Sequence, residues 1–236
     1  MPIQNGIAQD NNIFGTPFKV DLIPVSNKTA RPQIKMTPKY VTVHNTGNRA
    51  KGATAENNSE YVDNNTGYVS WHFTVDDKQI IQELPINETA WHAGDGRGQG
   101  NMTTIGVEIC EYEGINWAKA KENFFKLAMF LKANVPSLNR DFLVPHQKWS
   151  GKYCPHRILD EGWSKFLIEY HTYETRPIIK EPTEEERVSA LSRELAAHKI
   201  YNDVDYWTNV FLGKEPANPT FLRMAFSNVL DRIKGI

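Results

Sequence analysis

Residues 39–46, KYVTVHNT, are the stretch from which the fold is best inferred. The run is short and β-branched, with Thr-Pro before it and Thr-Gly-Asn at its end, so it predicts a strand that ends near His44. Side chains alternate across a strand, so Val41 and Val43 share one face, whereas Thr42 and His44 share the other. A histidine at a strand end is often only hydrogen-bonded, but this polar, turn-forming end is also where functional side chains are commonly placed.

Two further β-rich stretches follow. One predicts a hairpin, with a strand near 69–75, a turn at 76–78 and a second strand near 79–84. The other, TTIGVEICEY at 103–112, predicts a strand whose apolar run is interrupted by Glu108. A carboxylate in such a strand costs free energy unless it has a partner or faces water. Glu108 is therefore either a charge on an edge strand or a general acid or base.

Helices are mixed with these strands. Apolar side chains recur at helical spacing over about 117–134, and EGWSKFLIEYH at 161–171 predicts a helix that closes the first unit. Residues 1–39 are rich in Asn, Pro, Gly and Thr and predict an irregular lead-in. Together the elements indicate an α/β or α+β domain over about 20–175.

The C-terminal part has a different pattern. Two prolines and a charge run at 175–187 indicate a linker, and apolar residues then recur at helical spacing near 188–196 and 221–233. About 50 residues in a few helices is near the lower limit for a domain that folds alone. We therefore expect this module either to pack on the first unit or to self-associate.

The composition is that of an ordinary globular protein. The 236 residues include 27 basic and 28 acidic side chains, with a formal net charge of −1, which gives no reason to expect nucleic-acid binding. No apolar stretch approaches the roughly 20 residues of a membrane-spanning helix. The first residues show neither the basic start nor the apolar run of a secretory signal. We expect synthesis in the cytoplasm, no nucleic-acid partner and no membrane insertion.

The stretch VPHQKWSGKYCPHR at 144–157 holds several groups with reactive chemistry. His146 and Cys154 are separated by seven residues, and zinc readily takes both imidazole nitrogen and thiolate sulfur. A catalytic zinc site uses three protein ligands, of which His44 could supply the third. Lys152 would favour the thiolate form of the cysteine.

Other interpretations of Cys154 remain open at this point. It could be a nucleophile with His146 or His156 as its base, half of a disulfide with Cys110, or a buried inert thiol. Pro155 follows it directly, which weakens the nucleophile interpretation because such cysteines often open a helix. The lack of a secretory signal disfavours the disulfide.

A glycine-rich segment, WHAGDGRGQGN at 91–101, predicts a loop. It lacks the strand and helix context of a dinucleotide site and the terminal Lys-Ser/Thr of a P-loop. Trp91 and His92 instead suit the wall of a groove for a large polar ligand.

Five motifs occur in one order along the chain: YVTVHNTGN, SWHFTVDD, WHAGDGRGQGN, TTIGVEIC and PHQKWSGKYCPHR. They resemble those of the zinc-dependent N-acetylmuramoyl-L-alanine amidases of the type-2 family, especially phage endolysins, which are kin to peptidoglycan-recognition proteins. The resemblance covers roughly residues 20–170. It implies an α/β fold with a mixed central β-sheet flanked by helices, and hydrolysis of the amide bond between N-acetylmuramic acid and L-alanine in bacterial peptidoglycan.

The resemblance also implies roles for individual residues. His44, His146 and Cys154 match the zinc ligands, Glu108 matches the carboxylate that activates water, and Lys152 matches a residue that stabilises the oxyanion.

Four further residues are expected in the substrate groove: Trp71, His72, Trp91 and His92. Trp71 occupies a position where some members carry a catalytic tyrosine. Tryptophan has no phenolic proton to give, which shifts the expected acid–base role to Glu108.

The resulting prediction divides the chain into a zinc amidase domain over 1–175, a linker over 176–186 and a small helical cell-wall-binding or self-associating module over 187–236. The expected protein is an endolysin made in the host cytoplasm that acts on the wall after release. The alternatives are a peptidoglycan endopeptidase with a cysteine nucleophile, and a wall-binding protein without turnover.

Overall fold

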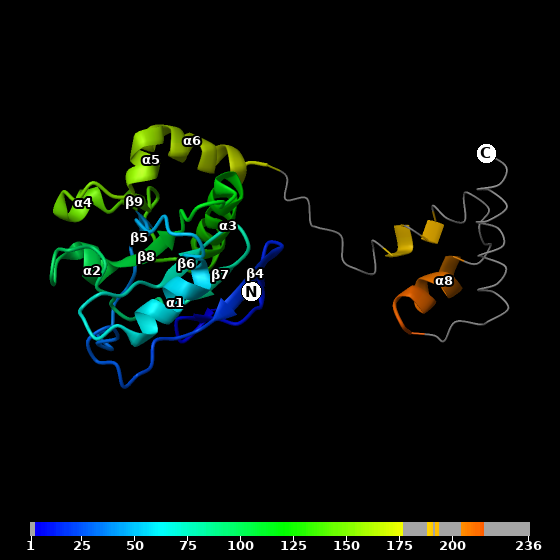
Figure 1. The fold of residues 1–236 in the computed structure, drawn as a ribbon, viewed down its shortest axis with the longest axis horizontal. Helices are drawn as coiled ribbons and strands as arrows, with labels where there is room; N and C mark the ends of the chain where they lie inside the picture. Colours follow the sequence, from blue (N-terminus) through cyan, green and yellow to red (C-terminus); the bar gives the residue numbers. More distant parts are fainter. Residues whose placement is uncertain (1–2, 177–187, 191, 194–203, 215–236) are drawn as a thin grey trace. The chain divides into compact units, whose positions relative to one another are not determined.

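The structure, a computed structural model, describes the following residues: 3–176, 188–190, 192–193 and 204–214. Contacts between Cα atoms divide the chain into two compact units, Met1–Ile178 and Ile179–Ile236 (Figure 1). None of the described helices is long and apolar enough to cross a membrane.

In the second unit the structure describes helix α8 (Val204–Phe211), in which Trp207 is buried and Phe211 is exposed. Most of the linker predicted at 176–186 and of the module predicted at 187–236 lies outside the described residues, so these two assignments stay predictions.

The first unit contains nine strands and six helices among the described residues. The strands are β1 (Ile3–Gln4), β2 (Ile7–Ala8), β3 (Asn12–Ile13), β4 (Thr16–Val20), β5 (Tyr40–Asn45), β6 (Phe73–Val75), β7 (Ile80–Gln82), β8 (Thr104–Ile109) and β9 (Leu143–Pro145). The helices are α1 (Ala55–Asn64), α2 (Gln99–Thr103), α3 (Trp117–Asn134), α4 (Gln147–Ser150), α5 (His156–Glu161) and α6 (Trp163–Glu174).

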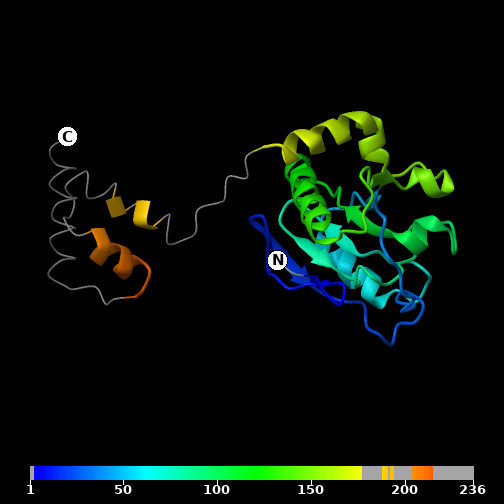
Figure 2. The ribbon, with the colours of Figure 1, turned by 180° about the vertical axis from the view of Figure 1, so that it is seen from behind.

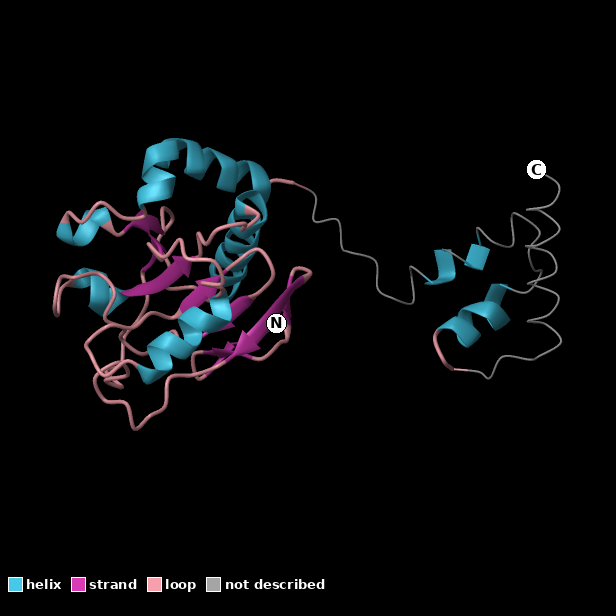
Figure 3. Ribbon diagram, in the orientation of Figure 1, coloured by secondary structure: helices cyan, strands magenta, loops and turns pink. Residues whose placement is uncertain are grey.

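Seven of the strands form one mixed sheet in the order β3-β4-β7-β6-β8-β5-β9. The pairs β4–β7, β6–β8, β8–β5 and β5–β9 are parallel, and β3–β4 and β6–β7 are antiparallel. Figure 3 shows the strands as a layer with helices packed around it. The expected fold class, an α/β domain with a mixed central sheet, is confirmed.

Helices cover both faces of this sheet. Val41 and Val43 point into the main core, where they join Phe124 of α3 and Phe166 of α6, and α1 packs on the opposite face against β6 and β7 (Figures 1 and 2). Parallel strands covered on both faces are expected to be apolar throughout. The strand β5 follows this pattern on the face of Val41 and Val43, whereas its other face carries the buried polar residues Thr42 and His44.

Most elements expected from the sequence are present. The strand at 39–46 is β5, the hairpin is β6–β7, and the strand at 103–112 is β8. The helix expected over 117–134 is α3, and the closing helix expected at 161–171 is α6.

Two expectations need correction. Residues 1–39 are not wholly irregular, because β3 and β4 belong to the main sheet and β4 pairs in parallel with β7. The loop expected over 91–101 ends at Gly98, and α2 begins at Gln99. The Asp95 carboxylate accepts hydrogen bonds from the backbone N–H groups of Gly100 and Asn101 at 2.6 and 3.1 Å, and so stabilises the start of this short helix.

Candidate metal centre and its cavity

Three neighbouring parallel strands, β8, β5 and β9, bring the predicted site residues together at their carboxyl ends. The register of β5 and β8 sets His44 directly beside Glu108, and β5 pairs with β9 so that Val43 lies beside Pro145. His146 follows Pro145, and its N–H donates to the carbonyl of Val43 at 3.3 Å. The carboxyl ends of parallel strands are where α/β proteins commonly bind their ligands.

The side chains of His44, His146 and Cys154 converge on one point. His44 Nδ1 lies 3.0 Å from His146 Nδ1 and 3.7 Å from Cys154 Sγ, and the three donor atoms lie within 4.8 Å of one another. All three residues are buried. Zinc bonds in a tetrahedral site separate ligand atoms by roughly 3.3–3.6 Å. The spacing and the chemistry of this donor set therefore fit zinc.

The surroundings of His44 and His146 favour the neutral imidazole ring, which is the form that binds a metal. Burial lowers the pKa of His44 well below its ordinary value and also lowers the pKa of His146, which favours neutral rings. The second nitrogen of each ring has a partner: His44 Nε2 lies 2.9 Å from His92 Nδ1, and His146 Nε2 lies 3.0 Å from Ser150 Oγ. Metal-binding histidines are commonly oriented through their second nitrogen in this way.

Glu108 stands beside this cluster. Its Oε1 is 3.8 Å from His44 Nδ1, and its Oε2 is buried without a hydrogen-bond partner among the described residues. Burial raises the pKa of Glu108 to about 8, whereas the positive charge of Lys152 acts in the opposite direction. A carboxyl group that exchanges its proton near neutral pH is suited to general acid–base catalysis.

The surroundings of Cys154 differ from those of a nucleophile. Burial raises the pKa of its thiol to about 12, whereas nucleophilic cysteines have a lowered pKa. Cys154 and Cys110 are both free thiols, so the disulfide interpretation is not supported.

Cys154 does not open a helix, as expected from the proline that follows it. Helix α5 begins at His156 with Pro155 at its N-cap position, so Cys154 lies just before the helix. Proline is tolerated there because a backbone N–H at the start of a helix has no partner within the helix. His156, which had no assigned role, bonds Glu111 Oε2 through Nε2 at 2.9 Å and so connects α5 to the segment after β8.

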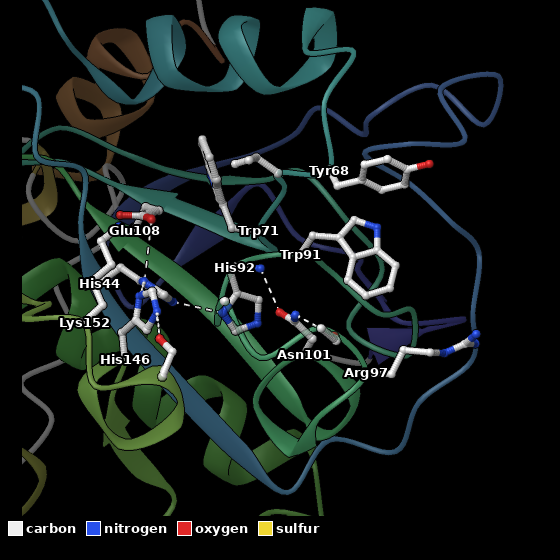
Figure 4. Close-up of a pocket in the computed structure, with 14 residues that line it drawn as sticks. His44, Tyr68, Trp71, Trp91, His92, Arg97, Asn101, Glu108, His146 and Lys152 are labelled. Carbon is white, nitrogen blue, oxygen red and sulfur yellow. Dashed lines mark hydrogen bonds and ion pairs between the residues drawn. The ribbon is translucent and has the colours of Figure 1, made fainter.

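A cavity of about 610 Å³ lies over the donor cluster (Figure 4). His44, Glu108, His146 and Lys152 line one end of it, and Lys152 is exposed to solvent there. Trp71 and Trp91 stand next to this end in Figure 4, and Tyr68 and Arg97 lie further out. The cavity thus combines a polar, metal-compatible end with an aromatic wall, as expected for a groove that holds a large ligand.

The four residues expected in the groove have different positions. Trp71, Trp91 and His92 line the cavity, although His92 is largely buried behind His44. His72 is fully buried and is not among the residues that line the cavity. Its Nε2 binds the carbonyl of Glu88 and its Nδ1 accepts from the N–H of Gly106, which is a structural arrangement.

The sequence did not indicate a site role for several further residues that line the cavity, among them Tyr68, Arg97 and Ser150. Tyr68 is 73% exposed. Its position in the turn-forming NNTGYVS segment was a usable signal, because functional side chains are commonly placed in loops. Nothing in the local sequence indicates the contact of Ser150 with His146, since both lie in a segment without clear periodicity.

The mixed sheet with this donor set at the carboxyl ends of its parallel strands defines an α/β domain with a candidate metal centre. The chain belongs to the N-acetylmuramoyl-L-alanine amidase family, whose model matches residues 34–157, more than half of the chain. The resemblance to this amidase family inferred from the five motifs is therefore confirmed.

Two of the curated relatives are amidases of Bacillus subtilis (strain 168). The chain is 49% identical over 162 residues to N-acetylmuramoyl-L-alanine amidase CwlH, and 49% identical over 148 residues to N-acetylmuramoyl-L-alanine amidase XlyA. The matches cover 68% and 62% of this chain, and 63% and 48% of the relatives. The chain thus spans about half to two thirds of these curated proteins.

The fold comparison agrees with the sequence comparison. The structure of the catalytic domain of XlyA superposes with a TM-score of 0.62 at 46% identity, over 66% of this chain and 99% of that chain. The shared part is therefore the whole of that solved catalytic domain.

Proposed function

We propose that the protein is a zinc-dependent peptidoglycan hydrolase that cleaves the amide bond between N-acetylmuramic acid and L-alanine. The observation that carries the proposal is the convergence of His44, His146 and Cys154 at one end of a cavity, with Glu108 in register with His44. The family match supports the reaction. Because the chain covers only part of its curated relatives, the activity of the whole protein belongs to the proposal.

The site residues have separate roles in this account. His44, His146 and Cys154 hold zinc, which when bound lowers the pKa of water and polarises a carbonyl group. Glu108 accepts the proton of the attacking water and returns it to the departing amine of L-alanine, a role that suits its raised pKa. Lys152, at the exposed edge of the cavity, stabilises the negative charge that develops on the carbonyl oxygen.

The aromatic wall holds the substrate next to these groups. Trp71 is fixed by a hydrogen bond from its Nε1 to Thr74 Oγ1 at 2.7 Å, and its ring stacks on Tyr61 at a centroid distance of 6.4 Å. Together with Trp91 it offers flat apolar surface to the sugar and the first residues of the peptide.

The biological setting is also a proposal. An endolysin made in the host cytoplasm would act on the wall after its release by another protein. The second unit then either binds the cell wall or mediates self-association.

Digestion of purified peptidoglycan tests the reaction and the metal together. The protein is expected to reduce the turbidity of a wall suspension, to lose this activity on treatment with a chelator and to regain it on addition of zinc. Metal analysis should find about one zinc per chain. Unchanged activity after complete removal of the metal would contradict the proposal.

The same experiment separates the two alternatives. An endopeptidase with Cys154 as nucleophile should survive chelation and be inactivated by a thiol-alkylating reagent. A wall-binding protein without turnover should sediment with the walls but release no new amino groups. The raised pKa of Cys154 already disfavours the first alternative.

A further inference from the structure

His92 lies directly behind the first proposed zinc ligand. Its Nδ1 is 2.9 Å from His44 Nε2, the nitrogen that points away from the donor cluster, and the two rings meet edge to face with centroids 5.0 Å apart. Both residues are buried, so a substrate is not the natural partner of this ring nitrogen.

The backbone around His92 fixes its ring in this place. The N–H groups of His92 and Ala93 both donate to Asn101 Oδ1 at 2.8 Å. Gly106 of β8 leaves room for the ring, because a Cβ atom at this position would lie only 2.7 Å from His92 Cγ. A side chain at Gly106 would therefore displace His92 from His44.

On the other side of the His92 ring, threonine hydroxyl groups form a chain of hydrogen bonds. The direction of each bond, from donor to acceptor, is fixed by the groups at the two ends of the chain. The Thr104 hydroxyl donates its one hydrogen to the carbonyl of Gly100, which can only accept. Trp149 Nε1, which can only donate, bonds Thr42 Oγ1 at 2.8 Å, and the Thr42 hydroxyl in turn donates to Thr104 Oγ1 at 2.8 Å. Thr104 Oγ1 can therefore only accept a hydrogen bond at its 3.4 Å contact with His92 Nε2.

This polarity assigns the hydrogen atoms of both histidines. His92 carries its hydrogen on Nε2, directed at Thr104, so its Nδ1 has a free lone pair and accepts from His44 Nε2–H. A neutral His44 with its hydrogen on Nε2 presents the lone pair of Nδ1 to His146 and Cys154.

We propose that His92 is a positioning residue for the zinc site: with Thr104 behind it, it holds His44 in the one tautomer and ring orientation that can bind zinc through Nδ1. This role differs from the groove contact expected from the sequence. The inference rests on the proposed zinc site, and its test uses metal binding without substrate.

The test compares two substitutions of similar size at position 92. His92→Asn places an amide oxygen near the position of Nδ1 and keeps an acceptor for His44, whereas His92→Leu keeps volume but removes the acceptor. Zinc affinity is measured by competition with a chromophoric chelator, and the absorption bands of the cobalt-substituted protein report ligand geometry. We expect His92→Leu to weaken zinc binding by about 10- to 100-fold and to alter the cobalt bands. We expect His92→Asn to recover most of the affinity.

A second pair of variants tests the hydrogen bond between Thr104 and His92 without a substitution at the histidine. Thr104→Val removes the acceptor for His92 Nε2–H, and Thr16→Val removes a buried hydroxyl of the core that contacts Asn123 and Lys126 instead of the site. Weaker zinc binding in Thr104→Val than in Thr16→Val supports the proposal. Equal binding in this pair overturns it, even if His92→Leu does not fold.

The zinc measurements distinguish a failure of the proposed function from a failure of the proposed role of His92. If the unmodified chain binds no zinc, the proposed function is wrong. If it binds zinc and His92→Leu binds equally well with unchanged cobalt bands, only the positioning role of His92 is wrong.

Discussion

Glu108 interrupts the apolar run of β8, which lies between β6 and β5 and not at the edge of the sheet. The interpretation of Glu108 as an edge-strand charge is therefore excluded. A buried carboxylate oxygen without a partner among the described residues costs free energy, and such costs are typical of functional sites.

A substitution at this residue tests its role. Glu108→Gln keeps the shape of the side chain but removes its ability to accept and return a proton. We expect zinc content to stay at the level of the unmodified protein while the rate of wall lysis falls by about 10²- to 10⁴-fold. Lysis at the normal rate by the zinc-loaded variant would show that Glu108 is not the base.

The candidate ligands could be named from the sequence, but their partners could not. His44, His146 and Cys154 were grouped from residue chemistry and from the resemblance, and the structure places their donor atoms together. The contact of His92 with His44 joins residues 48 positions apart, and depends on the loop geometry set by Asn101. No local pattern encodes such a contact.

Among the elements, those with a strong local pattern were predictable. The β-branched run of β5 and the helical periodicity of α3 need no information from elsewhere in the chain. By contrast, β9 has three residues and becomes a strand through its pairing with β5, and β4 contains Pro17 and pairs with a strand about 60 residues away. Helix α1 was not predicted, because its sequence AENNSEYVDN is mostly polar.

Helix α1 also carries an unfavourable charge that gives a testable dependence on pH. Burial raises the pKa of Asp63 from 3.8 to about 6, and this residue lies in the last turn of the helix, where a negative charge is disfavoured. The folded state therefore binds this proton more tightly than the unfolded state. The stabilising effect of protonation is fully present below about pH 4 and is lost as the pH rises through about 6.

The substitution Asp63→Asn should remove this dependence. Denaturant unfolding of both proteins between pH 4 and pH 7 measures it. We expect the variant to gain stability relative to the unmodified protein as the pH rises, with most of the change complete near pH 7. A constant difference across this range would mean that Asp63 does not titrate with a raised pKa.

In the whole molecule, the two compact units suggest a division of functions, with catalysis in the first unit and attachment or self-association in the second. The solved catalytic domain of XlyA matches this chain over 99% of its own length, so we expect the first unit to fold on its own. The second unit is proposed to bring the enzyme to the wall or to join two chains.

Removal of the second unit tests this division. A chain that ends at residue 178 is expected to cleave soluble muramoyl peptides at the normal rate but to lyse intact walls at least about tenfold more slowly, because it lacks the second point of attachment. Sedimentation with walls and analytical ultracentrifugation of both proteins distinguish wall binding from self-association. Equal lysis and equal binding by the short chain would exclude an anchoring role.

The proposed reaction is defined by the bond that is cut, and the new chain ends in digested peptidoglycan identify this bond. After digestion with the zinc-loaded protein, the free amino termini are labelled and identified, and reducing sugars are measured in the same sample. We expect new L-alanine amino termini in proportion to the loss of turbidity, with no rise in reducing sugars. New reducing ends, or new amino termini from other residues of the peptide without L-alanine, would show that a different bond is cut.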